Sequence, residues 1–351
     1  MARRLALVTA LLAAGSVGAT PALAQDAGDS RTEVRTVSPA GVPDTRTVTT
    51  VERRAGRTVE RTVVEGTGGD GDARLLSETV DETEASAGGI VERTRREYIV
   101  GPNGVRTLVA TVAERTEERA DGGRLTVRDY TEPDLNGRSR TTRQEREETV
   151  ARGDGAYRTR IDIAEPSSRG LVQTRRIERV EQRDGDELVA RDSTTYADPT
   201  GRGDLDAVER RVLTRDQEGG RARSVELVYR ADDNDNLVPR ERIERLERAG
   251  AGGGQIVSED VYTRGVNGPA GSLRLERRTE SVRTDRPGGG GTTTRTVSEA
   301  RNGRMQVVER VVERMARDAT GDVVIERETQ RVDVNGRFRT VSTTHARESG
   351  Q

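Results

Sequence analysis

Short segments in which Val, Ile or Tyr is interspersed with Thr, Arg and Glu follow one another along most of the chain, and clusters rich in Gly, Asn and Asp separate them. Runs of this composition bounded by turn-forming residues predict β-strands. One set of clusters recurs about every 33 residues, the range in which repeat architectures are sought. Its members are Gly66–Gly71, Gly101–Gly104, Asp134–Gly137, Pro166–Gly170, Asp198–Gly201, Asp232–Asn236, Gly265–Gly268, Ala300–Gly303 and Asp333–Gly336.

A second set of turn clusters falls between the members of the first, so each repeat holds two strands and two turns. Its members are Asp121–Gly123, Gly153–Gly155, Asp184–Asp186, Asp216–Gly220, Ala249–Gly254, Pro287–Gly291 and Asp318–Gly321. Weaker matches at Pro39–Gly41 and Ala55-Gly56 indicate that the array starts soon after the N-terminal region. Tyrosines keep the same spacing and precede turns of the first set, at Tyr98, Tyr130, Tyr196, Tyr229 and Tyr262.

The hairpin around Asp318 allows its strand register to be predicted. A three-residue loop, a type I turn followed by Gly321 in the left-handed region, would place Asp318 opposite Asp322. Counting back from this loop brings three pairs of opposite charges face to face: Glu309 with Arg331, Glu313 with Arg327, and Arg314 with Glu326. Exposed cross-strand pairs contribute only about 0.2–1 kcal/mol each, but they favour one register over its neighbours.

Neither face of the predicted strands is purely apolar, which predicts a thin sheet that is wet on both sides. In the segment before Asp318, one face carries Val307, Glu309, Val311, Glu313 and Met315, and the other carries Val308, Arg310, Val312 and Arg314. We therefore expect an all-β chain of tandem 33-residue hairpin repeats that form an extended, strongly twisted antiparallel meander, largely single-layer. Long charged helical hairpins and a β-solenoid are the alternatives. An outer-membrane barrel would need an apolar lipid-facing band and aromatic girdles, and aromatic residues make up 2% of the chain.

The N-terminal segment from Met1 to Ala24 has the three parts of a secretory signal peptide. Arg3 and Arg4 begin it, Leu5–Val17 is an apolar run too short to span a bilayer, and Ala22-Leu23-Ala24 is a cleavage site. The predicted organisation is a signal peptide at 1–24 and one continuous hairpin array at 25–351. We expect an extracytoplasmic location in the periplasm, at the cell surface or outside the cell, with no transmembrane segment after cleavage.

Charge and composition exclude several classes of binding site and a thick hydrophobic core. The 59 basic residues and 61 acidic residues give a net charge of −2, so no broad basic field is available for nucleic acid. The chain has no cysteine, which removes disulfides and thiolate metal sites. Hydrophobic residues make up 31% of the chain and there is no Trp, so a thick core cannot form.

No constellation of residues points to catalysis, and we expect neither an enzyme nor a cofactor. His345 is the only histidine, and no nucleophile–base set or phosphate loop is present. The run Asp232–Asn236 begins like a calcium loop, but Leu237 stands where that loop needs glycine and Ile243 where it needs glutamate. We therefore predict no catalytic, cofactor-binding or metal site.

Two resemblances accompany these patterns. The stretch from Tyr130 to Arg138, echoed from Tyr196 to Arg202, resembles a loosened YD repeat, a motif of large bacterial surface and toxin-delivery shells. Most of the chain is similar to uncharacterised exported bacterial proteins whose Arg/Glu/Thr-rich hairpins carry Asn-Gly-Arg turns. The second resemblance implies no activity.

The leading functional hypothesis is a non-enzymatic structural or interaction protein of the cell envelope or exterior. An open sheet has two free edges, which predicts self-association through edge strands. The alternative is a repeat protein that binds polysaccharide or another polymer, with Tyr98, Tyr130, Tyr196, Tyr229 and Tyr262 as a surface ladder. A hydrolase built on an Asp/Glu pair is a remote third hypothesis.

Overall fold

The computed structural model describes residues 30–37, 45–67, 73–86, 88–101, 103–168, 170–198, 204–250, 253–264, 272–286, 290–318, 321–333 and 335–350. Over these ranges the chain forms twenty β-strands and no α-helix. The strands are β1 (Ser30–Val37), β2 (Thr45–Arg54), β3 (Arg57–Thr67), β4 (Ala73–Ser86), β5 (Ile90–Val100), β6 (Arg106–Glu118), β7 (Arg124–Pro133), β8 (Ser139–Gly153), β9 (Ala156–Ser167), β10 (Gly170–Asp184), β11 (Glu187–Ala197), β12 (Asp206–Glu218), β13 (Arg221–Ala231), β14 (Leu237–Ala249), β15 (Gln255–Arg264), β16 (Leu273–Arg286), β17 (Gly290–Arg301), β18 (Arg304–Arg317), β19 (Val323–Val332) and β20 (Phe338–Gly350). The predicted signal peptide at 1–24 lies outside the described residues. Among the residues that are described, no helix is long and apolar enough to cross a membrane.

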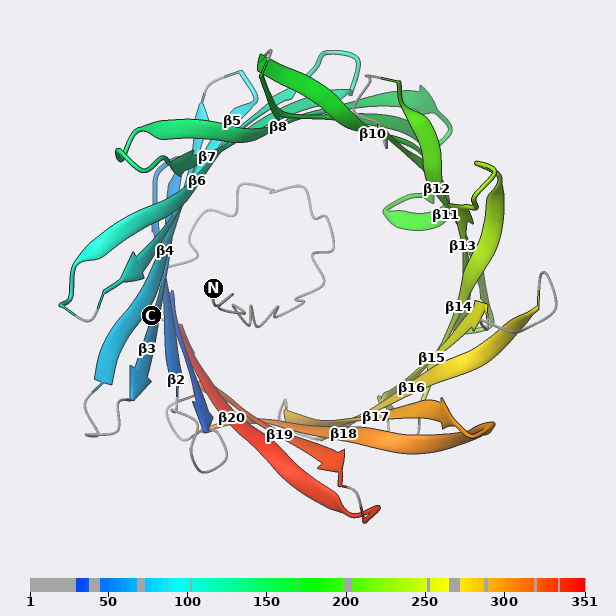
Figure 1. Cartoon of the computed structure of the whole chain (residues 1–351). Coiled ribbons are helices and arrows are strands. Elements are labelled where there is room, and N and C mark those ends of the chain that lie inside the picture. Colours follow the sequence, from blue (N-terminus) through cyan, green and yellow to red (C-terminus); the bar gives the residue numbers. More distant parts are fainter. Residues whose placement is uncertain are drawn as a thin grey trace.

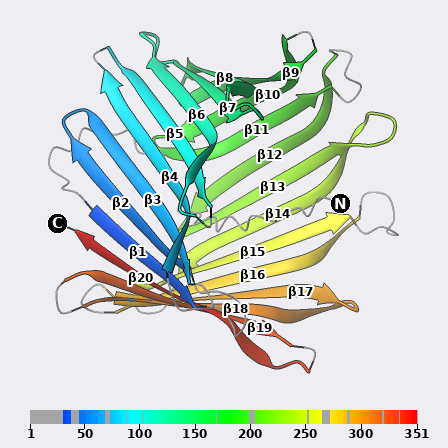
Figure 2. The same ribbon diagram turned by 60° about the vertical axis from the view of Figure 1, so that its left-hand side comes forward.

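The strands close into a single barrel. Each strand pairs antiparallel with the next along the chain, and β1 also pairs with β20 from Ser30 opposite Gly350 to Val37 opposite Thr343. The result is a ring of tilted strands (Figures 1 and 2). The all-β class, the hairpin order and the single layer are confirmed. The open meander is wrong, as are the helical-hairpin and solenoid alternatives, because the coiling of the sheet brings its two end strands together.

Closure also overturns the predicted self-association through edge strands. The two strands that would be the edges of an open sheet, β1 and β20, share a ladder of backbone partners along the whole of β1. Closing a sheet is the one arrangement that removes its edges altogether. Among the described residues, β1 is therefore paired on both sides and is not available as an edge for a second chain.

The turns lie where the glycine-rich clusters predict them. In the β18–β19 hairpin the amide of Asp318 donates to the carbonyl of Asp322 at 2.9 Å, and Gly321 has a φ of 88°. Three cross-strand pairs follow the predicted register, namely Glu309 with Arg331, Glu313 with Arg327 and Arg314 with Glu326. The turn of β4–β5, where Gly88 and Gly89 both have positive φ, is the one that the predicted sets omit.

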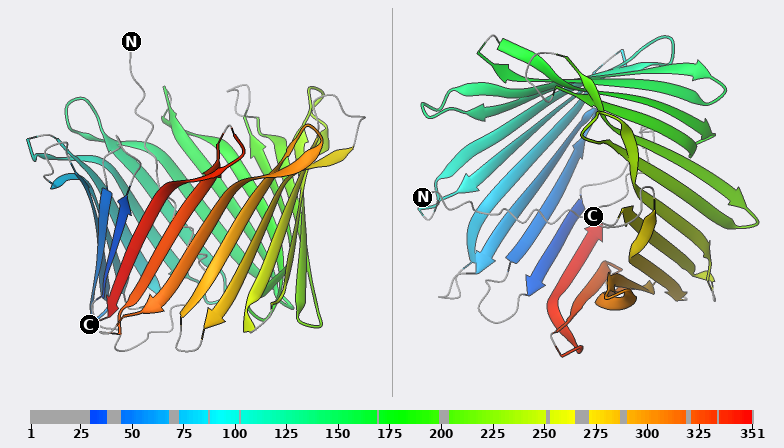
Figure 3. Two further views of the ribbon diagram at one scale, coloured as in Figure 1. Left: turned by 90° about the horizontal axis from the view of Figure 1, so that it is seen from below. Right: turned by 45° about the vertical axis from the view of Figure 1, so that its right-hand side comes forward.

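A β-bulge near one end of the hairpins marks each described repeat. In nine hairpins the second strand carries one residue with no partner, just after the turn of the first set, and this residue bends the strand. The skipped residues are Leu76, Val109, Thr142, Thr174, Val208, Arg240, Glu276, Val308 and Val341. All nine lie toward the same end of the barrel, here called the bulged rim, where the strands bend away from straight (Figure 3). The opposite end, which holds the turns of the second set, is called the plain rim.

Side chains alternate between two walls that stay consistent around the ring. The most buried aliphatic side chains, Ile163, Val228, Val261 and Val311, all belong to one wall, and the hollows of the sheet open on the same wall. On the other wall Val180 is 54% exposed and Val282 is 36% exposed in mid-strand. Because side chains crowd together on a concave surface and spread on a convex one, the first is the inner wall and the second the outer wall.

The bulges explain the two errors in the predicted faces of β18. From Glu309 onward the alternation follows the prediction, but Val308 is skipped, so Val307 pairs with Ser298 on the outer wall and Val308 lines the hollow of the inner wall, which makes a second error. Charged side chains stand on the outer wall as well, so neither face of the sheet is purely apolar. There Glu78, which is 2% exposed, accepts from Arg61 at 2.6 Å and lies 2.9 Å from Arg106, whose guanidinium stacks over Tyr98.

Candidate functional site: the polar inner wall

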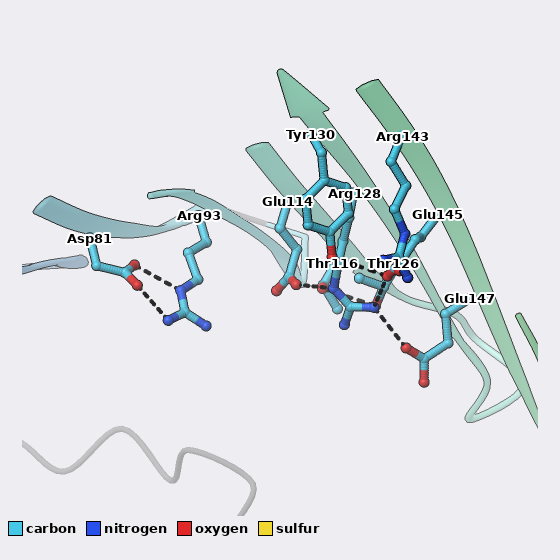
Figure 4. A network of polar contacts seen from close by, with 10 residues as sticks. All are labelled: Asp81, Arg93, Glu114, Thr116, Thr126, Arg128, Tyr130, Arg143, Glu145 and Glu147. Atoms are coloured by element: carbon cyan, nitrogen blue, oxygen red, sulfur yellow. Dashed lines mark hydrogen bonds and ion pairs between the residues drawn. The ribbon is translucent and has the colours of Figure 1, made fainter. Parts of the chain in front are cut away.

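The inner wall of β4–β8 holds two groups of charged side chains, the Asp81–Arg93 pair and a cluster around Arg128 (Figure 4). Arg93 on β5 donates to both carboxylate oxygens of Asp81 on β4. Arg128 on β7 donates to Glu114 on β6 and to Glu147 on β8, the latter at 3.0 Å. These residues face the interior because the antiparallel registers place them on the same side of successive strands.

Arg128 is the centre of the second group. A third carboxylate, Glu145, lies 3.6 Å from it and also contacts Arg143. Burial opposes the charged form of Arg128, but the hydrogen bonds that it donates to Glu114 and Glu147 outweigh burial, so its pKa is raised above the ordinary value. The guanidinium therefore stays protonated at every physiological pH, and three carboxylates share it.

Tyr130 lies beside this cluster. Its hydroxyl donates to Glu145 at 3.2 Å, and the guanidinium of Arg143 lies 5.2 Å from its ring centre. Burial is the main cause of a raised pKa for Tyr130, and the neighbouring Glu145 adds to it. The phenol is thus held neutral as a hydrogen-bond donor rather than activated as a base.

Across the ring, β14–β18 present a second charged surface to the interior. It surrounds a hollow of about 490 Å³ lined by three arginines and three glutamates, along with Val, Thr and Ser side chains. Glu309 is the shared acceptor, with Arg295 at 3.3 Å and Arg331 at 3.1 Å. The charges are balanced here as well, so the hollow does not favour a ligand of one sign.

One part of the inner wall carries a single charged residue among its described inward positions. On β1 and β2, next to the closing seam, the inward positions are Thr32, Val34, Thr36, Thr45, Thr47, Thr49 and Val51, with Arg53 only at the plain rim. The row continues onto β3, where the hydroxyls of Thr49 and Thr62 lie 3.0 Å apart. The wall at the seam is therefore covered by hydroxyl and methyl groups, whereas the wall opposite is covered by ion pairs.

The structure does not assemble the five repeat tyrosines into one ladder. Tyr98, Tyr196, Tyr229 and Tyr262 project from the outer wall, and Tyr130 projects inward. Each of the five lies next to a bulge, so the tyrosine spacing marks the bulges of the repeat. Sequence reasoning missed the charged groups of the inner wall, because the bulges shift which residues of a strand share a face.

The calcium-like run Asp232–Asn236 forms the hairpin turn between β13 and β14. The carboxylate of Asp232 accepts from the backbone amides of Asn234 at 2.9 Å and Asn236 at 3.0 Å, and these bonds lower its pKa. Asp134 and Asp333 make the same pair of bonds in their own turns. Among the described residues, no group of three or more His, Asp or Glu side chains is placed to hold a metal ion. His345 is exposed on the outer wall, opposite Glu326 and Arg35.

Comparisons with known proteins identify no family. No family model matches the chain, and no curated protein matches it. Among solved structures, OccK5 (OpdH) of Pseudomonas aeruginosa is 8% identical with a TM-score of 0.43, and 92% of this chain covers 96% of it. OccAB2 of Acinetobacter baumannii is 9% identical with a TM-score of 0.39, over 91% and 96% of the two chains. A protein of unknown function from Bacteroides fragilis is 11% identical with a TM-score of 0.22, over 47% of this chain and 87% of that one. These likenesses are too weak to carry an argument, and the resemblance to YD repeats stays a prediction.

Proposed function

We propose that the chain is a non-enzymatic polar conduit of the cell envelope or exterior, a closed ring that stands in water and whose lumen holds or guides an elongated hydrophilic molecule. The observation that carries this proposal is that charged residues line both walls of the closed barrel. It keeps the predicted structural or interaction role and the extracytoplasmic location.

The size of the ring supports an open lumen. Twenty strands spaced by about 4.8 Å and tilted by about 40° give a backbone radius of roughly 20 Å. Side chains fill the interior of an eight-stranded barrel, whereas barrels of 16–18 strands already enclose an aqueous channel. The inner wall is lined by ion pairs and hydroxyls, which water solvates well, so a hydrophilic chain can occupy this space.

The outer wall supports an aqueous location for the barrel. Arginines project outward in mid-strand and pair with carboxylates of neighbouring strands: Arg61 with Glu78, Arg176 with Asp162, Arg210 with Asp192, and Arg278 with Asp260. An arginine on the lipid face of a barrel costs about 2–4 kcal/mol at the bilayer midplane. A surface with this many charges is stable in water and unstable against hydrocarbon.

The proposal is tested by labelling a matched pair of single cysteines in detergent-free buffer. Thr293 and Thr294 are neighbours on β17, the first on the inner wall and the second on the outer wall. The chain has no cysteine of its own, so Thr293→Cys and Thr294→Cys each give one reactive site.

We expect both variants to fold without detergent, as shown by their circular dichroism, and both to react with a small charged maleimide. A long polyethylene glycol maleimide should also reach Thr293→Cys, more slowly than Thr294→Cys, because it must enter the ring. If Thr293→Cys resists even the small reagent, the lumen is filled. If the protein folds only in detergent, the outer wall is not a water-facing surface. Either result contradicts the proposal.

A further inference from the structure

The exposed apolar side chains of the barrel are concentrated at one end. Twelve large hydrophobic side chains are exposed among the described residues, and eight of them lie at the bulged rim: Leu76, Ile99, Val105, Leu135, Leu171, Val172, Val307 and Phe338. The plain rim has Val189 and Leu246 within the described ranges, and the other two, Val180 and Val282, lie further along their strands. Val105 and Leu135 stand at hairpin turns, 56% and 107% exposed, with no strand to cover them.

These side chains occupy one continuous arc of the bulged rim. They belong to the hairpins from β3–β4 to β9–β10 and to β17–β18 and β19–β20, which flank the seam on either side (Figure 1). At the bulged rim, the described parts of the hairpins β11–β12 and β13–β14, across the ring, contribute no exposed large hydrophobic residue. Among the described residues, the bulged rim is therefore apolar on the seam side.

The charged side chains of the bulged rim also differ between the seam side and the opposite side. The apolar arc has exposed arginines at its turns, and the side chains of Arg138, Arg304 and Arg337 have no ion-pair partner among the described residues. The acids of the same turns, Asp134 and Asp333, are engaged by backbone amides. The opposite arc is acidic, and the described residues in and next to its turns include Asp204, Asp206, Asp233 and Asp235.

We propose that the apolar arc of the bulged rim seats the barrel on the surface of an anionic phospholipid bilayer. Apolar turn tips enter the boundary between headgroups and acyl chains, and the unpaired arginines meet the lipid phosphates. The acidic arc is repelled by the same surface, so the ring docks by its seam side. This inference does not rest on the lumen having a cargo.

A lipid surface fits these features better than a single protein partner does. The exposed side chains stand on separate hairpins along a curved rim rather than in one contiguous groove, and exposed basic residues lie in or next to three of the turns, namely Arg138, Arg304 and Arg337. A fluid surface can accept many small separate contacts, and basic residues beside exposed apolar ones are typical of interfacial anchoring.

The test is co-sedimentation of residues 25–351, which contain every described strand, with vesicles of phosphatidylglycerol and phosphatidylcholine. Pure phosphatidylcholine vesicles are the lipid control. The variant is the double substitution Val105→Asp and Leu135→Asp. The matched control is Val189→Asp, which places the same charge at an exposed aliphatic residue of the plain rim.

We expect the unmodified protein and Val189→Asp to sediment with the anionic vesicles and the double variant to lose at least about tenfold in apparent affinity. All three proteins should keep the same circular dichroism, because the substituted residues lie at turns or near a strand end and their side chains are partly or fully exposed. Failure of the unmodified protein to bind anionic vesicles overturns the proposal. So does equal loss in Val189→Asp, or capture of the rim by a soluble protein while vesicles stay unbound.

Discussion

Arginine–carboxylate pairs take the place of a hydrophobic core in this protein. Asp162 on β9 shows how they work: it accepts from Arg176 on β10 at 2.9 Å, from Arg160 on its own strand at 2.8 Å and from Gln173 at 2.6 Å. Burial raises its pKa, but the hydrogen bonds from the two arginines outweigh burial and the net pKa is lowered. Such a carboxylate stabilises the fold only while it is ionised.

Substitution of Asp162 should therefore change how stability depends on pH. Because its pKa is lower in the folded state than in the unfolded state, its contribution is present above the unfolded value and is lost as pH falls through the folded one. We expect Asp162→Asn to lower the free energy of unfolding at neutral pH by about 1 kcal/mol, since the site is partly exposed. Urea titrations at neutral pH and between about pH 5 and pH 3 measure both effects.

In Asp162→Asn, stability should decrease less with acid than in the unmodified chain. The control is Asp186→Asn, in the exposed turn between β10 and β11, which should leave both the stability and its pH dependence unchanged. An unaltered acid dependence in Asp162→Asn would show that this carboxylate does not stabilise the barrel.

Each hairpin is a strand, a turn and a second strand with one skipped residue. Sequence patterns locate the strands and turns well, because glycine and Asx residues act locally. The bulges escape the same reasoning, since a residue such as Val308 looks like any other member of an alternating strand. A single skipped position then reverses the expected wall for every residue between the bulge and the turn, as Val307 shows.

Deletion of a bulge residue should be far less harmful than deletion of a paired neighbour. Without Val308, Glu309 would follow Val307 directly, and Val307 would keep both its partner Ser298 and its wall. We expect this deletion to cost only about 1 kcal/mol of unfolding free energy, from the lost bend at the rim. Deletion of the buried, paired Val311 should instead shift the residues of β18 on one side of the deletion by one position. The side chains of those residues would then face the opposite wall.

Denaturant unfolding followed by circular dichroism measures the difference between the two deletions. The chain without Val311 should be several kcal/mol less stable than the chain without Val308. Equal losses in the two chains would mean that Val308 is held by contacts of its own and is not an inserted residue.

Closure is the property of the whole barrel that the sequence does not reveal. Strand pairing between neighbours follows from short turns, but the pairing of β1 with β20 joins residues more than 300 positions apart and leaves no local signal. It depends on the coiling summed over twenty strands, and that sum is set by small contributions from every bulge and pair. The candidate site was hidden for the same reason, because an inner wall exists only once the ring is closed.

A disulfide across the seam would test closure directly. Val34 and Ala346 are direct partners on the inner wall, and facing residues of antiparallel strands have the Cα separation that a disulfide needs. With Val34→Cys and Ala346→Cys together, mild oxidation should give an internal bond seen by mass and by mobility in a non-reducing gel. The bonded form should melt at a higher temperature, because the bond closes a very long loop.

The control for the seam disulfide pairs Val34→Cys with Thr159→Cys, which lies on the inner wall of β9 rather than on a neighbouring strand. This second pair should remain reduced under the same conditions. Reduced thiols in the Val34–Ala346 pair would mean that the ring is open in solution.

The two-strand repeat has a consequence for how such a protein can change in size. An antiparallel ring closes only with an even number of strands, and gain or loss of one repeat always alters that number by two. Duplication of a unit would therefore preserve which residues point inward, and would widen the bore by roughly 2 Å in radius each time. Genes for this architecture can thus vary its calibre by copying whole units, with no need to redesign the junction where the first and last strands meet.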